Sequence, residues 1–322
     1  MTNPLLPASD LPTYGYAQAW RMSRRRASRT PLPSKTRPPR HVNRRVVAIL
    51  MVVPIAAVAI VTILVATRSS SRVEPIARLG TSDVHSLAFV GDDTRHLLFG
   101  HHGGVLETLD GGTTWTDLGA REDAMGMGAA TGGSIVIAGH DVFSASSDGG
   151  RTWANVTTDL PDRDIHGFAR DPADPGHMWA ALASGGLWES RDGGLHFERV
   201  YDQNVFLPVA MTGPGGPRIV AVAAAGLVAS EDGGRSWVTL GDPGLYPIVS
   251  LAATADGAVL IAGGLDGLRR SDDGGRTWKD PGFPGAPFAV ALSGDGRTVA
   301  LVTRSAEFFR SDDGGATWVA AH

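Results

Sequence analysis

Two patterns of hydrophobic residues divide the chain. Residues 46–66 form an apolar run without a charge, interrupted only by Pro54 and Thr62. Such a run is typical of a membrane helix, because about 20 apolar residues rising 1.5 Å each cross a hydrocarbon core of about 30 Å. Residues 73–322 instead alternate short apolar runs with glycine-rich turns, as in Val84–Phe89. This second pattern is typical of short β-strands.

The flanking charges predict how the apolar run is oriented. Residues 1–45 hold ten Lys/Arg and one acid, whereas only Arg68 and Arg72 follow the run closely. Because basic residues stay on the cytoplasmic side, the N-terminus is expected in the cytoplasm. A cleaved signal peptide is the alternative, although its apolar region normally has about 7–15 residues. We predict a single-pass protein of the cell membrane with a disordered cytoplasmic tail (1–45), a signal-anchor helix (46–67) and an extracytoplasmic body (68–322).

Composition excludes several classes of protein. The chain has no cysteine, so a disulfide scaffold, a thiol nucleophile and a cysteine zinc cluster are excluded. Its 42 glycines indicate many turns rather than long helices. From Arg68 onward, 19 basic and 32 acidic residues give a net charge of −13. We therefore expect no nucleic-acid partner, and the basic tail beside the apolar run suits anionic lipid head groups.

One eight-residue motif, Ser/Thr-x-Asp-Gly-Gly-x-Thr/Ser-Trp with small variations, recurs six times in the body. Its aspartates are 38, 44, 40, 41 and 40 residues apart. Asp-Gly-Gly favours a tight turn, because glycine adopts positive φ and the carboxylate accepts backbone N–H groups. We call this motif the box turn and favour a structural role over a calcium-binding or catalytic one. Its aspartates and aromatic residues are Asp110, Asp148, Asp192, Asp232, Asp273 and Asp313, and Trp115, Trp153, Phe197, Trp237, Trp278 and Trp318.

The repeat length predicts the fold. Each period of ~40 residues has room for four short strands, with the box turn joining the third to the fourth, which is the content of one propeller blade. Six box turns predict an all-β, six-bladed β-propeller. We expect the strand near Ile76–Leu79 to close the ring by pairing with the final blade.

These motifs resemble Asp-box (BNR) repeats, which occur in sialidases, sortilin-type receptors and photosystem II assembly propellers. Short strands leading into loops such as His101-His102-Gly103-Gly104 are also similar to small bacterial membrane-anchored propellers labelled glycosylhydrolase or exo-alpha-sialidase. The resemblance covers nearly all of residues 80–322. It implies the fold more strongly than the function, because enzymes and non-enzymes share the motif.

The residues that a sialidase-like activity would imply are poorly matched. Such an enzyme would use an arginine cluster, a tyrosine paired with a glutamate, and an aspartate as acid/base. The body offers only Tyr201 and Tyr246, and Glu198 lies three residues before Tyr201. A glycosidase with two carboxylates stays open, and its candidates are Glu122, Asp123, Asp162 and Asp164.

Aligning the blades by their box turns reveals a group of metal-ligating residue types. Loops that join the second strand to the third, and one blade to the next, share the ring face opposite the box turns. At aligned positions there, blades one to three carry histidine or methionine, whereas blades four to six carry mainly apolar residues. Met127 and Asp141 lie nearby. The candidate metal ligands are His85, His101, His102, Met125, His140 and His166.

Imidazole with thioether would suit copper, and imidazole with carboxylate would suit zinc or another divalent ion. The alternative is a set of polar channel residues that contact water. We expect a recognition module for a protein, a glycan or a metal. A glycoside hydrolase of sialidase-like ancestry and an assembly scaffold for another membrane complex are the two alternatives.

Overall fold

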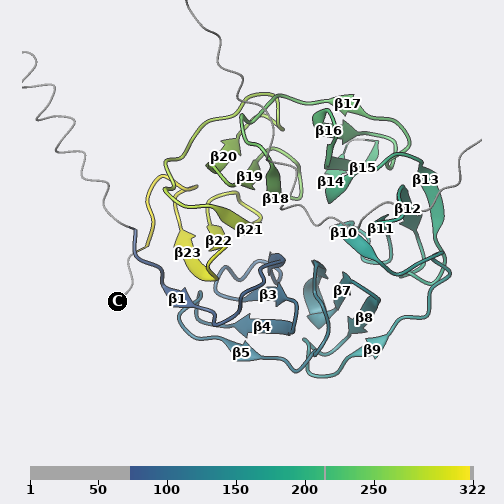
Figure 1. The fold of residues 1–322 in the computed structure, drawn as a ribbon, viewed down its shortest axis with the longest axis horizontal. Coiled ribbons are helices and arrows are strands. Elements are labelled where there is room, and N and C mark those ends of the chain that lie inside the picture. The colour runs from purple at the N-terminus through teal and green to yellow at the C-terminus, as the bar shows by residue number, and fades with distance from the viewer. Residues whose placement is uncertain (1–72, 214, 320–322) are drawn as a thin grey trace, which may run out of the picture. The chain divides into compact units, whose positions relative to one another are not determined.

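The computed structural model describes residues 73–213 and 215–319. The predicted tail (1–45) and membrane helix (46–67) lie outside these residues, within which no helix is long and apolar enough to span a membrane. The described residues form six small antiparallel sheets arranged in a ring (Figure 1). The predicted all-β, six-bladed propeller is therefore confirmed.

Each of the first three blades has four strands, ordered from the channel outward as in the chain. Blade 1 consists of β2 (Ser86–Phe89), β3 (Leu97–His101), β4 (Gly104–Thr108) and β5 (Thr116–Asp117). Blade 2 consists of β6 (Gly126–Ala129), β7 (Ile135–Gly139), β8 (Val142–Ser146) and β9 (Ala154–Asn155), with a 3₁₀ turn, η1 (Thr131–Gly133), between β6 and β7. Blade 3 consists of β10 (Ile165–Arg170), β11 (Met178–Leu182), β12 (Leu187–Ser190) and β13 (Glu198–Tyr201).

Blade 4 has the same four-strand order, whereas blades 5 and 6 differ at their outer edges. Blade 4 consists of β14 (Phe206–Gly213), β15 (Gly216–Ala223), β16 (Gly226–Ser230) and β17 (Val238–Thr239). Blade 5 has three strands, β18 (Ile248–Ala253), β19 (Leu260–Gly264) and β20 (Gly267–Ser271), and a single Arg270–Lys279 bridge where the fourth would lie. Blade 6 consists of β21 (Pro287–Leu292), β22 (Val299–Thr303) and β23 (Glu307–Ser311), completed by β1 (Ala77–Arg78) from the start of the body.

Ring closure follows the prediction. Strand β1 pairs antiparallel with β23, with Ala77 opposite Phe308 and Arg78 opposite Glu307. The guanidinium of Arg78 also lies 2.9 Å from the Glu307 carboxylate. Because the first and last parts of the body share one sheet, the ring is closed without a disulfide.

The hydrophobic core lies between the blades. Second strands such as β7 and β22 are buried along their whole length, since both faces of each blade pack against a neighbouring blade. Between blades 2 and 3, for example, the ring of Phe143 makes edge contacts with those of Phe168 and Phe197, at centroid distances of 6.0 and 5.9 Å. Six such clusters hold the described blades together.

Each box-turn carboxylate is used within its own turn. In all six turns, one oxygen accepts the hydroxyl hydrogen of the Ser/Thr two residues earlier, at 2.7–2.9 Å, and also accepts the backbone N–H four residues later. The same hydroxyl accepts the N–H of the second glycine. In the last turn, hydrogen bonds led by the Thr317 hydroxyl hold the pKa of Asp313 at about 2. The aspartates thus organise turns at the outer rim.

Candidate functional site

Six histidine and aspartate side chains from blades 1 to 3 gather into two groups of three, at the ring end opposite the box turns. The first triad is His85, His102 and Asp123, and the second is His140, Asp164 and His166. Each offers three ligand atoms within 4.8 Å of one another. Four of the six histidine and methionine residues predicted from the sequence therefore come together, and two aspartates complete the groups.

The topology explains this convergence. His102 and His140 lie in the loops between the second and third strands of blades 1 and 2, whereas His85 directly precedes β2. Asp123 lies in the connection to blade 2 and Asp164 in the connection to blade 3. Loops of these two kinds leave the same end of the sheets, so the first triad combines two residues of blade 1 with one from the connection to blade 2. The second triad combines His140 of blade 2, Asp164 of the next connection and His166 of β10 in blade 3.

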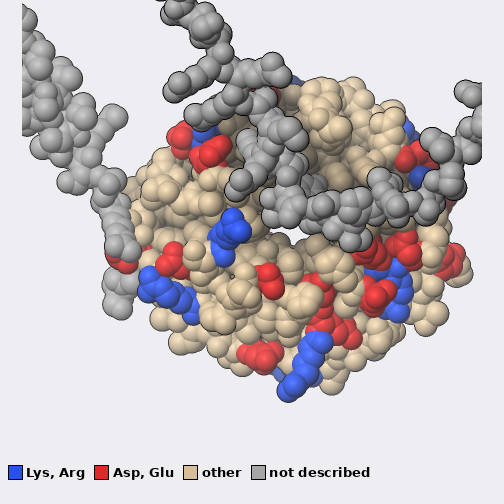
Figure 2. Space-filling model, viewed as in Figure 1, with Lys and Arg blue, Asp and Glu red and all other residues tan. Residues whose placement is uncertain are grey.

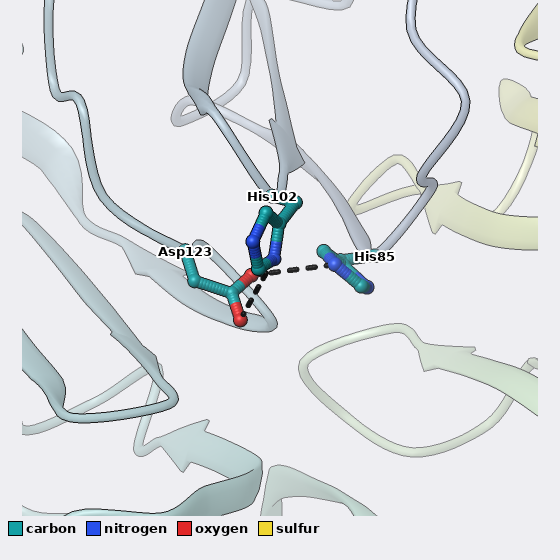
Figure 3. A group of neighbouring side chains, drawn as sticks. All are labelled: His85, His102 and Asp123. Atoms are coloured by element: carbon teal, nitrogen blue, oxygen red, sulfur yellow. Dashed lines mark ion pairs between the residues drawn. The ribbon is translucent and has the colours of Figure 1, made fainter. Parts of the chain in front are cut away.

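In the first triad, the Asp123 carboxylate points toward both histidines (Figure 3). Its Oδ1 lies 3.3 Å from His85 Nε2, and its Oδ2 lies 3.5 Å from His102 Nδ1. Asp123 is only 6% exposed. Neither its Oδ1 nor His85 Nε2 has a hydrogen-bond partner among the described residues. This triad therefore contains two buried polar atoms that are not satisfied.

In the second triad, Asp164 Oδ1 lies 3.0 Å from His166 Nε2 and 3.6 Å from His140 Nε2. The His140 and His166 rings meet edge to face, with centroids 5.1 Å apart. The backbone fixes this arrangement, because His140 and Asp164 form an isolated antiparallel bridge. All three side chains are partly or well exposed, so this triad faces solvent.

One hydrogen bond connects the triads. His140 Nδ1 lies 2.6 Å from Asp123 Oδ2, so Asp123 contacts three histidines. Gly139 allows Asp123 to come this close, because a Cβ on Gly139 would lie 2.2 Å from the Asp123 carbonyl oxygen. The end of β7 and the connection to blade 2 therefore pack backbone against backbone beside the site.

The charges around the site favour cations. The loops 121–123 and 162–164 together carry four acids and two arginines. Figure 2 shows acidic side chains gathered on one face of the ring over the part that carries β7, β8 and β10. Burial lowers the pKa of His85, an effect that the nearby Asp123 carboxylate partly opposes. A lowered pKa keeps the imidazole neutral, which is the form that binds metals.

Other sequence candidates lie outside the two triads. The ring of His101 stacks on Phe99, and its Nδ1 accepts the Gly103 N–H at 3.1 Å. Met125 directly precedes β6, and its side chain is half-buried. Tyr201 lies in β13, where its ring packs against Trp237 at 5.8 Å, and Tyr246 lies between blades 4 and 5. The two tyrosines are therefore in different parts of the ring.

Asp123 and Asp164 were expected only as loop charges or glycosidase acids, not as metal ligands. A signal for them exists in the chain. Each stands two residues before the aligned first position of its blade, Met125 or His166. The same offset marks both aspartates as candidates, but Asp83 shares it before His85 without joining a triad, so the offset alone does not identify the partners of the histidines.

Fold and site together define a six-bladed propeller with a histidine and aspartate cluster at one end of its ring. No family model matches the chain, and no curated protein matches it either. Solved structures of other proteins do share the fold.

Three solved structures illustrate this similarity. A nidogen–laminin complex matches with a TM-score of 0.57 and 13% identity, over 70% of this chain and 91% of the other. YCF48 bound to D1 peptide matches with a TM-score of 0.52 and 16% identity, over 73% and 95%. An ancestral GH74 enzyme matches with a TM-score of 0.51 and 15% identity, over 77% of this chain but only 40% of the enzyme. At these identities the similarity establishes the fold alone.

Proposed function

We propose that this protein is a membrane-anchored Asp-box propeller that binds a divalent metal ion at the histidine and aspartate end of its ring. The helix at 46–67 anchors it, and residues 68–322 lie outside the cytoplasm. The first ligand set is His85, His102 and Asp123. Histidine with carboxylate favours zinc over copper, so zinc is the proposed ion.

The unsatisfied state of Asp123 carries this proposal. Leaving a buried carboxylate oxygen without a partner costs about 1–3 kcal/mol or more, and native proteins rarely tolerate it. Here the unpaired oxygen faces an equally unpaired imidazole nitrogen, that of His85, at 3.3 Å. A cation between the two atoms would satisfy both at once.

The spacing of the ligand atoms also supports zinc. Zinc bonds to nitrogen and oxygen are about 2.0–2.2 Å long, so tetrahedral geometry places neighbouring ligand atoms about 3.3–3.5 Å apart. The two proposed ligand atoms His85 Nε2 and Asp123 Oδ1 lie 3.3 Å apart, and all three ligand atoms of the triad lie within 4.8 Å of one another. Three protein ligands would leave one coordination position for water or for a group of a bound partner, as in zinc sites that exchange ligands.

The test is metal binding by the full chain, purified in detergent and freed of metal with a chelator. We expect calorimetric titration with Zn²⁺ to show stoichiometric binding, which His85→Ala and His102→Ala each weaken at least tenfold. His101→Ala is the matched control, because this neighbouring histidine belongs to neither triad. If wild type takes up no stoichiometric metal, or if the variants at 85 and 102 bind as tightly as wild type, the proposal is wrong.

We propose that the fourth coordination position of the ion binds a group of a protein partner. Two of the structures that share the fold are complexes, YCF48 with a D1 peptide and nidogen with laminin, which is the basis for this choice. Pull-down from detergent extracts with and without chelator tests it, since a metal-dependent partner is released by the chelator. The same preparation assayed on a panel of aryl glycosides tests the hydrolase alternative.

A further inference from the structure

His140 is held between two carboxylates in a way that the first metal ion does not explain. Its Nδ1 lies 2.6 Å from Asp123 Oδ2, and its Nε2 lies 3.6 Å from Asp164 Oδ1. Ionised carboxylates only accept hydrogen bonds, so His140 Nδ1 must donate to Asp123. A neutral imidazole has one N–H, and His140 Nε2 is then left with a lone pair.

The lone pair of His140 Nε2 faces an oxygen that also carries lone pairs. The same oxygen, Asp164 Oδ1, lies 3.0 Å from His166 Nε2. Two acceptor atoms that face each other repel unless a donor or a cation lies between them. These side chains are about half exposed, so either a water molecule that donates to both acceptors or a metal ion that both ligate fits between them.

The contact between Asp123 and His140 favours a metal. A histidine that binds a metal through one nitrogen almost always donates its other N–H to a carboxylate, which fixes the ring and raises its basicity. Asp123 supplies such a carboxylate, and it is buried while the imidazole of His140 is half exposed. The distances of 3.0 and 3.6 Å around Asp164 Oδ1 also bracket the ligand spacing of about 3.3–3.5 Å in tetrahedral zinc sites.

We propose that the ring end binds two ions, the second through His140, Asp164 and His166, and that Asp123 couples them. Asp123 ligates the first ion through Oδ1 and orients His140 toward the second ion through Oδ2. This inference rests on the proposed function, because the first ion is the one described above. The second ion lies on the more exposed triad and is the one that an outside ligand reaches more easily.

Calorimetric titration of the metal-free full chain with Zn²⁺ tests this inference. We expect two equivalents for wild type, one for His85→Ala, one for His166→Ala, and none when both changes are combined. The control His101→Ala keeps two equivalents. Asp123→Asn weakens both binding events, the second by about 10–100-fold, as is usual when a carboxylate behind a ligating histidine is lost.

The outcomes separate the two proposals. If wild type binds one equivalent and His166→Ala leaves that binding unchanged, the second ion is refuted and the first stays in place. If wild type binds no Zn²⁺ stoichiometrically, both proposed ions are refuted. If wild type binds two equivalents of Zn²⁺ but Asp123→Asn weakens only one of the two binding events, the coupling through Asp123 is refuted. Thermal unfolding of each metal-free variant verifies folding, and His166→Gln replaces His166→Ala if the latter fails to fold.

Discussion

Gly139 controls the position of Asp123, so Gly139→Ala should disturb the site without removing a single ligand. The backbone of Gly139 does not adopt positive φ, and alanine is compatible with its conformation. The difficulty is space, because the new Cβ would lie 2.2 Å from the Asp123 carbonyl oxygen and 3.4 Å from its Cβ. Contacts below 3.0 Å are essentially never seen, so the Asp123 backbone must retreat by about 1 Å.

The size of the effect follows from this displacement. Overpacking of this kind destabilises the fold by about 1–3 kcal/mol. Replacing glycine by alanine offsets about 0.4–1 kcal/mol of this loss, because it lowers the conformational entropy of the unfolded chain. We expect a net loss of about 1–2 kcal/mol, or roughly 2–8 °C in Tm for a body of this size. The hydrogen bond from His140 to Asp123, now 2.6 Å, would stretch beyond hydrogen-bonding range. Zn²⁺ affinity should fall by about 10–100-fold.

Thermal unfolding and Zn²⁺ titration of the same preparation measure the two effects. Gly215→Ala is the matched control, because Gly215 has no atom within 4 Å of its added Cβ and no positive φ. This control should unfold at or slightly above the wild-type temperature and bind Zn²⁺ normally. If Gly139→Ala behaves like the control in both measurements, this contact does not position Asp123.

Three further predictions concern stability. Ser311→Ala leaves a box-turn N–H without its acceptor at a fully buried position, so denaturant unfolding should show a loss of about 1–3 kcal/mol. Glu189→Ala leaves the buried His177 without its closest carboxylate, 2.8 Å away, and should cost about 3 kcal/mol in the same assay, whereas Glu189→Gln should cost less. Because hydrogen bonds hold the pKa of Asp313 at about 2, below its usual 3.8, its stabilising effect is complete above about pH 4 and lost as the pH falls through 2. Thr317→Val removes one of these hydrogen bonds, so its acid unfolding, followed by circular dichroism, should begin at higher pH.

The propeller could be predicted because its signal is local and repeated. Each box turn contains all the groups that it needs, from the Ser/Thr hydroxyl to the aspartate and the second glycine, so eight residues define it. Six copies at a period of about 40 then define the number of blades. Blade 5 was predicted with four strands but has three, because its outer edge keeps only the Arg270–Lys279 bridge, and an edge strand contributes little to the core pattern.

The cluster of histidines was predictable for the same reason, but the pairing of its aspartates was not. Asp83, Asp123 and Asp164 all stand two residues before the first aligned position of their blades. Only Asp123 and Asp164 join triads, whereas Asp83 is exposed. Each aspartate that joins meets a histidine from the loop of the preceding blade, His102 or His140. The preceding blade for Asp83 is blade 6, which carries Ser305 at that aligned position. A ligand set in this fold is thus a property of two neighbouring blades, and it depends on how closely their backbones approach, as at Gly139 and Asp123.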